Sequence, residues 1–317
     1  MTRETYRNSP WLDNRKACVD GVYHPISLDL LIPYHRQSQI QAPPRHYIFH
    51  TSHCCSTLLA RCLDALTAFM ALKEPVTLRQ LSELKRNINF PVLEANGQWR
   101  QLVNLIESLL SRTGDSEVTA LIKLTSICHN LIPDLLASDD ARGIFLYSDL
   151  TSHMASMYKD KARIDTYLEV YFPYLVHDMG QLCAGSSIRP DSLETHEKLA
   201  LMWVARILFY LRHRNQHAIA HLNSKQFLDH PRKTMNAVCD HLQVRVSSRE
   251  IDAVITGPLL KHEAKWRNMQ YDARSRHLEQ NVIVRNHESE IQAAHDWASQ
   301  WLPSPDLLED IPGDLCS

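Results

Sequence analysis

A polar segment, TSHCCST from Thr51 to Thr57, is the part of the sequence best suited to chemistry. An apolar run precedes it and an apolar pattern with helical spacing follows it, which predicts a strand, a loop and a helix that begins near Ser56. Helix N-termini present unpaired N–H groups and the positive end of the helix dipole, and both favour phosphate or sulfate. The segment therefore predicts an anion-binding loop. The alternative is an ordinary turn in which Ser56 only caps the helix.

Two charged residues, Glu74 and Lys123, stand at the ends of other predicted strands. Ligands of open α/β sheets bind at the carboxyl ends of the strands, so we expect both side chains to face the same cleft as the loop. A carboxylate at that place could act as a general base. The alternatives are a solvated strand terminus at Glu74 and a structural ion pair of Lys123 with a carboxylate such as Glu74.

The loop also contains two cysteines, Cys54 and Cys55, next to His53. A helix N-terminus lowers the pKa of a thiol, which is one way in which a nucleophilic cysteine arises. Residues that are neighbours in sequence need not be in contact, however. We therefore do not expect a catalytic cysteine.

The elements that must position these residues are short apolar runs, partly β-branched, which alternate with helical patterns. The predicted strands are His46–His50, Phe69–Lys73, Ala120–Leu124, Gly143–Tyr147 and Ala218–Leu222. The predicted helices are Ser56–Ala68, Gln101–Ser111, Ile127–Ala137, Leu150–Tyr158, Glu194–Arg212 and Arg232–Leu242. We predict an α/β fold with a central, mostly parallel sheet of about five strands flanked by helices. Residues 1–44 are expected to form an N-terminal extension packed on the core, and residues 45–317 an α/β domain with a helical C-terminal region.

The composition excludes several classes of protein. Only 8 of the 317 residues are glycine, and neither G-x-x-x-x-G-K-[ST] nor G-x-G-x-x-G occurs, so the familiar glycine-rich phosphate loops are absent. The net charge of −2 and the lack of a basic stripe predict no nucleic-acid partner. The first residues lack the apolar core of a signal peptide, and the longest apolar stretch, Leu199 to Leu211, contains Arg206. We expect a soluble, cytoplasmic protein with no membrane partner.

Metal binding is not expected. The 8 cysteines include no C-x-x-C pair, and we interpret them as reduced thiols. His262 begins the sequence HEAKW, which lacks the second histidine of H-E-x-x-H. His213, His217 and His221 are four residues apart, but a helix carrying all three would have to continue through a predicted break at Asn215.

Five segments of the sequence, taken together, resemble the P-loop sulfotransferases. The run HCCSTLL from His53 resembles the family's 5′-phosphosulfate loop, which usually reads Lys or Arg, Ser, Gly, Thr, Thr and then apolar residues. The other segments follow in the family's order: ALKEP at 71–75, LIKLT at 121–125, GIFLYSDLTSHMASMY at 143–158 and FLDHP at 227–231. The resemblance covers roughly residues 46–245 and implies a sulfotransferase-like P-loop fold of a divergent, bacterial type.

The resemblance also implies a reaction and a donor. Such enzymes transfer a sulfuryl group from 3′-phosphoadenosine 5′-phosphosulfate to a hydroxyl or amine, without a metal. The acceptor, a small molecule or a peptide, and the oligomeric state are left open. The residues that the resemblance places in the site are His53, Glu74 and Lys123 for catalysis, with Glu74 as the general base, and Cys54, Cys55, Ser56, Thr57, Ser148 and Ser156 for binding the donor.

Departures from the family pattern keep two alternatives open. His53 replaces the cation of the loop, and Ser148, followed by Asp149, replaces the arginine that holds the donor's 3′-phosphate. Cys55 stands where the family has glycine, so we expect a negative φ there. Substitute cations could come from Lys261, Lys265, Arg267, Arg274 and Arg276, unless these lie on a solvated helix of mixed charge. The alternatives are an enzyme that uses a different phosphorylated nucleotide and a non-catalytic binding protein that retains the fold.

Overall fold

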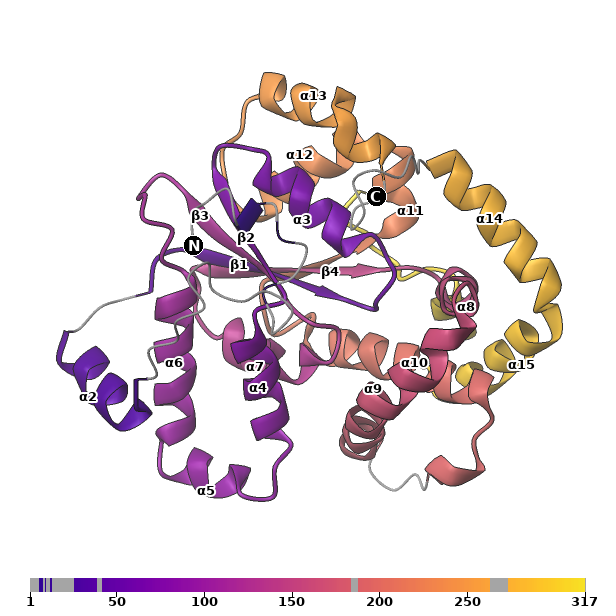
Figure 1. Cartoon of the computed structure of the whole chain (residues 1–317), viewed down its shortest axis with the longest axis horizontal. Helices are drawn as coiled ribbons and strands as arrows, with labels where there is room; N and C mark the ends of the chain where they lie inside the picture. The colour runs from indigo at the N-terminus through magenta and orange to yellow at the C-terminus, as the bar shows by residue number, and fades with distance from the viewer. Residues whose placement is uncertain are drawn as a thin grey trace.

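A five-stranded parallel sheet forms the centre of the molecule (Figure 1). The computed structural model describes residues 6, 7, 9, 12, 26–38, 42–183, 188–262 and 273–316. The strands are β1 (Arg45–His50), β2 (Phe69–Lys73), β3 (Thr119–Lys123), β4 (Ala141–Tyr147) and β5 (Ile219–Asn223), in the spatial order β2-β3-β1-β4-β5. Each strand begins and ends within one or two residues of its predicted bounds. The predicted α/β class with a parallel sheet of five strands is confirmed.

The strands are buried on both faces, and this explains their nearly continuous apolar sequences. In β1, Tyr47 and Phe49 point to one face and Ile48 to the other. Beside it, Phe145 and Ile144 of β4 divide in the same way. In the register of the sheet, Ile48 lies between Lys123 of β3 and Ile144 of β4, so β1 is the central strand.

Helices cover both faces of the sheet. The face that includes Ile48 packs against α3 (Ser56–Asp64), α11 (Ser224–Asp229), α12 (Pro231–His241) and α13 (Ser248–Thr256). The face that includes Phe49 packs against α4 (Val76–Lys85), α6 (Gln98–Leu110), α7 (Ile132–Leu135), α8 (Leu150–Tyr158), α9 (Lys161–Leu182), α10 (Thr195–His213) and α15 (Glu288–Ser299). Because the chain crosses from β3 over β1 to β4, the carboxyl end of β1 lies at a switch in the direction of winding, where such sheets bind ligands.

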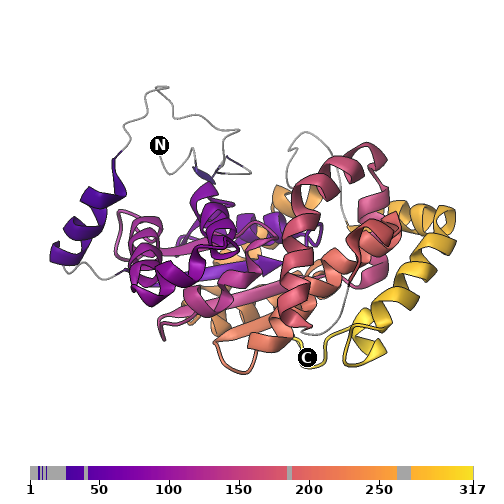
Figure 2. The ribbon, with the colours of Figure 1, turned by 90° about the horizontal axis from the view of Figure 1, so that it is seen from below.

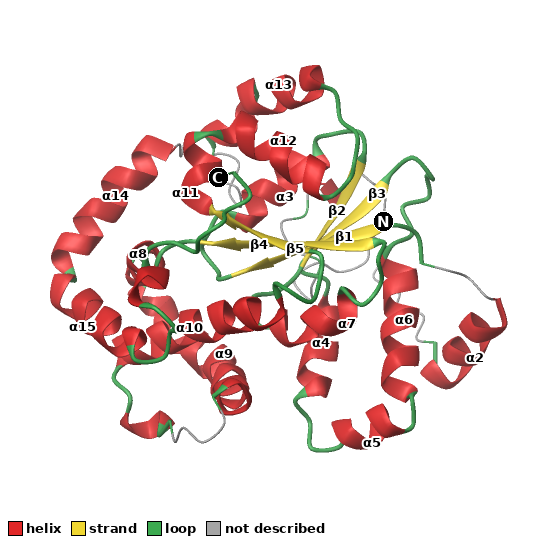
Figure 3. Ribbon diagram, turned by 180° about the vertical axis from the view of Figure 1, so that it is seen from behind, coloured by secondary structure: helices red, strands yellow, loops and turns green. Residues whose placement is uncertain are grey.

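The remaining elements lie at the periphery. They are α2 (Leu28–Ser38), α5 (Phe90–Ala95), α14 (Ala273–Asn286) and the short 3₁₀ helices η1 (Cys128–Leu131), η2 (Pro190–Ser192), η3 (Pro258–Lys261) and η4 (Pro305–Leu308). Helices α2 and α14 lie at opposite ends of the molecule (Figure 2). Figure 3 shows α14 passing along the outside from the neighbourhood of α11 to α15.

Three predicted helices differ from the structure. The helix predicted over Gln101–Ser111 begins three residues earlier, at Gln98. The helix predicted over Ser56–Ala68 ends at Asp64, and the one predicted over Ile127–Ala137 is divided into η1 and α7. Pro133 has no backbone N–H, so an unbroken helix through it would lose a hydrogen bond. The predicted break at Asn215 is confirmed, because α10 ends at His213 and His221 lies on β5.

Part of the predicted N-terminal extension contacts the edge strand β2. The N–H of Leu12 donates to the carbonyl of Lys73 at 2.7 Å, and the N–H of Val76 donates to the carbonyl of Leu12 at 3.2 Å. The buried Lys73 ammonium donates to the carbonyl of Tyr6 at 2.9 Å. These contacts place Leu12 beside the carboxyl end of β2, next to Glu74. The boundary at residue 44 stays a prediction.

Candidate functional site

The loop between β1 and α3 has a backbone that side chains rarely adopt. The φ angles of Ser52, His53 and Cys55 are 73°, 52° and 63°. The expected negative φ at Cys55 is wrong, because Cys55 adopts the left-handed conformation for which the family uses glycine. This conformation costs a residue with a Cβ about 1–2 kcal/mol, so it persists only where the surroundings hold it. Such turns can direct successive N–H groups toward one point, where an anion binds.

A buried histidine, His50, holds one end of the loop. Its Nδ1 accepts from the N–H of Ser52 at 3.1 Å, and its Nε2 lies 2.8 Å from the carbonyl of Leu124. Because Nδ1 is an acceptor, the proton must be on Nε2, which then donates to Leu124. Burial, followed by the nearby charge of Lys123, lowers the pKa of His50 well below its ordinary value. The ring is therefore neutral and acts as a fixed link between the loop and the end of β3.

The end of β4 holds the middle of the loop through one carbonyl oxygen. The Leu146 carbonyl accepts from the N–H of Thr51 at 3.1 Å and from the Cys54 thiol at 3.2 Å. Burial raises the pKa of Cys54 to about 11. A thiol that is buried and protonated is a poor nucleophile. Cys54 therefore anchors the loop through its hydrogen bond to Leu146.

The start of α3 is suited to receive an anion. Ser56 and Thr57 open this helix, and both are buried with 5% of their surface exposed. Cys55 precedes them as the N-cap residue, and its side chain forms no capping hydrogen bond. The first turn also lacks an acidic residue, so no carboxylate of this turn neutralises the positive end of the helix dipole.

An arginine from α14 reaches the loop. Arg276 donates to the carbonyl of His53 and to the sulfur of Cys55, both at 2.9 Å. The His53 side chain is exposed, and its ring lies edge-on to Tyr167 at 6.2 Å. Arg276 thus brings a permanent cation to the loop, next to His53. Among the other predicted cations, Lys261 and Arg274 are exposed, and two lie outside the described residues: Lys265 and Arg267.

Helix α14 is held in this position by its contacts with α8. Lys159 and Glu279 form an ion pair at 2.7 Å, in which the two side chains are 47% and 36% exposed. Tyr158 stacks on His287, just after α14, with ring centroids 4.4 Å apart. The stacked pair is the more durable contact, because exposed ion pairs contribute little.

Glu74 and Lys123 lie together at the same edge of the sheet. Their side chains form an ion pair, in which Lys123 is 1% exposed and Glu74 is 17% exposed. The N–H of Glu74 donates to the carbonyl of Lys123 at 2.6 Å, and Glu74 has a φ of 56°. The structure therefore contains the ion pair that the sequence left as an alternative for these two residues. The pair fixes the carboxylate in place, with part of it open to solvent.

The two serines predicted to hold a 3′-phosphate are placed differently from each other. Ser148 is 1% exposed, and among the described residues its hydroxyl has no hydrogen-bond partner. Its carbonyl accepts from the Trp203 indole at 2.9 Å. Ser156 is half-buried on α8. The neighbouring Asp149 caps α8 by accepting from the N–H of Ser152 at 2.7 Å. Neither Ser148 nor Asp149 replaces the bidentate arginine contact of the family.

Sequence reasoning missed two residues that support the loop. Tyr167 on α9 shares a hydrogen bond of 2.7 Å with the Ser52 hydroxyl. Arg206 on α10 is fully buried and donates to the carbonyl of Thr51 at 3.1 Å. The sequence did contain a signal for Arg206, because it is a cation inside an otherwise apolar run. A cation in such a run is buried with the helix and then needs hydrogen-bond acceptors from neighbouring elements. Tyr167 lies on α9, which the apolar pattern did not reveal.

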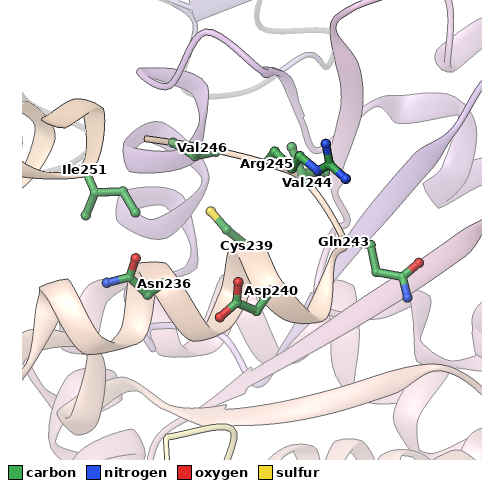
Figure 4. Close-up of a pocket in the computed structure, with 8 residues that line it drawn as sticks. All are labelled: Asn236, Cys239, Asp240, Gln243, Val244, Arg245, Val246 and Ile251. Carbon is green, nitrogen blue, oxygen red and sulfur yellow. The ribbon is translucent and has the colours of Figure 1, made fainter. Parts of the chain in front are cut away.

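Two pockets open on other parts of the surface. One of about 480 Å³ lies between α12 and the chain before α13, and Figure 4 shows Cys239 and Asp240 on its α12 side and Val246 opposite. Burial raises the pKa of Cys239 to about 12, so this thiol is not reactive. The other, of about 710 Å³, is a groove between α9 and the start of α10. Neither pocket includes a residue of the segment 51–57.

The structure adds two observations on metals and membranes. Within the described ranges, His, Cys, Asp and Glu side chains do not gather in groups of three or more that could hold a metal ion. The HEAKW sequence extends beyond the described residues. None of the described helices combines the length and the apolar character needed to cross a membrane.

Comparison with known proteins adds structural similarity only. No protein-family profile matches the sequence, and no curated protein matches it. Similar solved structures include the sulfotransferase domain from the curacin biosynthetic pathway, with 15% identity, a TM-score of 0.44, and coverage of 86% of this chain and 100% of that one. Another is the sulfotransferase STF9 from Mycobacterium avium, with 10% identity, a TM-score of 0.41 and coverage of 81% of each chain. A function must therefore be argued from the loop and the residues around it.

Proposed function

We propose that the protein is a sulfotransferase-like enzyme that moves a sulfuryl group from 3′-phosphoadenosine 5′-phosphosulfate to a hydroxyl or amine. The observation that carries this proposal is the loop at the carboxyl end of β1. It combines three left-handed residues, a helix N-terminus without a side-chain capping hydrogen bond from its N-cap residue, and the Arg276 guanidinium. Together these features favour an anionic group that bears several oxygens.

Each residue has a role in this reaction. The N–H groups of Cys54 to Thr57 and the hydroxyls of Ser56 and Thr57 bind the 5′-phosphosulfate, and Arg276 balances its charge. The acceptor oxygen or nitrogen attacks the sulfur, the bond from sulfur to the bridging phosphate oxygen breaks, and the acceptor proton passes to Glu74. Lys123 holds the Glu74 carboxylate in place. Catalysis then consists mainly of alignment and charge stabilisation.

The buried Ser148 favours a second candidate, an enzyme of the same fold that uses a nucleotide without a 3′-phosphate. Because Ser148 offers a hydroxyl in place of a bidentate arginine, we expect affinities for adenosine 5′-phosphosulfate and its 3′-phosphorylated form to differ by less than about tenfold, or roughly 1.4 kcal/mol. A larger preference for the 3′-phosphorylated form would show that other cations bind that group and would remove the second candidate.

Calorimetric titration tests the loop directly. The wild-type protein is titrated with 3′-phosphoadenosine 5′-phosphate, adenosine 5′-phosphosulfate and ATP. The double variant Ser56→Ala with Thr57→Ala should abolish binding, whereas Thr256→Ala with Ser289→Ala, at two exposed positions, should leave it unchanged. Unchanged affinity in the loop variant would show that the assignment is wrong. If the Glu74→Gln variant keeps both its nucleotide binding and its biological activity, the result favours a non-catalytic protein.

A further inference from the structure

Arg206 is a cation buried in the middle of α10 with 0% of its surface exposed. Its Nε donates to the carbonyl of Ser126 at 2.8 Å and its Nη1 to the carbonyl of Thr51 at 3.1 Å. Its Nη2 donates to the hydroxyls of Ser126 and Tyr167 at 3.3 and 3.0 Å. Within the part of the chain that the structure describes, these acceptors are all neutral. The guanidinium is hydrogen-bonded, but its charge is not balanced there by a carboxylate.

The nearest titratable neighbours do not balance this charge. His129 and His153 are fully buried, and the pKa of each is lowered well below its ordinary value by burial and then by the charge of Arg206. Both rings are therefore neutral. A buried charge without a counter-ion costs several kcal/mol, and proteins ordinarily pair such groups. Lys123, another buried cation at this edge of the sheet, is paired with Glu74.

The position of Arg206 relates its charge to the loop. Thr51, which accepts one of its hydrogen bonds, is the first residue of the loop. Tyr167 connects Arg206 to the next residue, since its hydroxyl contacts both the guanidinium and the Ser52 hydroxyl. The charge thus lies behind the loop, on the side of the sheet opposite to α3. An anion seated on the loop would be close to both the α3 dipole and this guanidinium.

We propose that Arg206 supplies a fixed positive charge to the anion site and that the anion bound by the loop is its counter-ion. This inference rests on the proposed function only in requiring that the loop binds an anion. Its consequence is specificity for charge: the site prefers a group that carries two negative charges, such as a phosphosulfate, over a group with one. Arg206 does not touch the ligand, so it is a specificity-determining residue and not a catalytic one.

The test compares two probes that differ in charge, adenosine 5′-phosphosulfate and the 5′-methylphosphate of adenosine. Arg206→Gln, which removes the charge, should weaken binding of the phosphosulfate at least tenfold, about 1.4 kcal/mol, and binding of the methylphosphate less than threefold. Arg206→Lys keeps the charge but loses the planar fork, and it should stay within threefold of wild type for both probes. Arg212→Gln, at an exposed position of the same helix, is the matched control and should change neither affinity.

The outcomes separate the possible roles. If Arg206 only holds the shape of the loop, Gln and Lys will weaken both probes equally, and the proposal is overturned. If Arg206→Gln does not fold, the Lys variant alone decides, because a loss of tenfold or more in a folded Lys variant contradicts a role of charge. If wild type binds both probes and Arg206→Gln shows no selective loss of affinity for the phosphosulfate, this inference is refuted and the proposed function is unaffected. A wild-type protein that binds 3′-phosphoadenosine 5′-phosphate but neither probe also refutes this inference and leaves the proposed function standing, whereas one that binds none of the three nucleotides refutes both.

Discussion

Cys55 caps α3 in a left-handed conformation, with a φ of 63°, and this strain can be measured by replacing Cys55 with glycine. The replacement also removes the sulfur that accepts from Arg276. Cys55→Ala removes the same contact but keeps a Cβ, so the comparison of Gly with Ala isolates the cost of the backbone. We expect Cys55→Gly to be the more stable of the two variants.

The expected difference follows from two opposing effects. A Cβ in the left-handed region costs about 1–2 kcal/mol, which glycine avoids. Glycine in turn gives the unfolded chain more freedom, which lowers stability by roughly 0.5–1 kcal/mol. The balance is about 0.5–1 kcal/mol in favour of glycine. In a chain of 317 residues this shifts the melting temperature by only about 1 °C, so urea denaturation is the better assay.

A second Ala-to-Gly comparison provides the control. Ala253 is exposed on α13, where glycine should lower the free energy of unfolding by about 1 kcal/mol. The same chemical change should therefore have opposite signs at the two positions. If Cys55→Gly is less stable than Cys55→Ala by as much as Ala253→Gly is less stable than wild type, the left-handed strain in the loop does not exist and the argument for a preformed anion site fails.

Three further predictions concern catalysis, charge and pH. Glu74→Gln should slow release of 3′-phosphoadenosine 5′-phosphate, measured with a panel of phenol, alcohol and amine acceptors, by about 10²–10⁴-fold, while Glu117→Gln, at an exposed position, leaves it unchanged. Arg276→Met should weaken calorimetric binding of adenosine 5′-phosphosulfate about tenfold, and equal losses in Arg276→Met and the exposed Arg274→Met would contradict the contact with the loop. Burial lowers the pKa of His46 to about 4, so its contribution to stability is complete above about pH 6.5 and is lost as the pH falls toward 4. His46→Gln should reduce that loss by about 3 kcal/mol in urea titrations, and a pH profile parallel to wild type would show that His46 does not titrate in this range.

The strands were predictable because a strand buried on both faces has a short, nearly continuous apolar sequence. Phe69–Lys73 was predicted at its observed bounds, and the other strands within one or two residues. Helix α9 was not predicted, because its polar side chains contact several neighbouring elements. Along it, Tyr167 contacts the loop and Asp178 forms a buried ion pair with Arg86 at 2.6 Å, so polar side chains interrupt the apolar pattern.

The loop could be located from the sequence, but its conformation could not. The spacing of apolar residues places a strand before Thr51 and a helix after Cys55, and both are observed. The left-handed angle at Cys55 depends on contacts made by distant residues, because Leu146 and Arg276 bind the loop from β4 and α14. A local pattern contains no information on such contacts. The ion pair of Glu74 with Lys123 was foreseeable only as one of several alternatives, since both residues end neighbouring strands.

The bond between Arg276 and Cys55 joins residues that are 221 positions apart, and this distance has a consequence for synthesis. At about 5–20 residues per second, roughly 10–45 s pass between translation of Cys55 and translation of Arg276. During that interval β1 and α3 can emerge from the ribosome, but the loop between them lacks its α14 contact. The anion site is therefore assembled late, and a nascent chain stalled before α14 should carry the loop without its arginine.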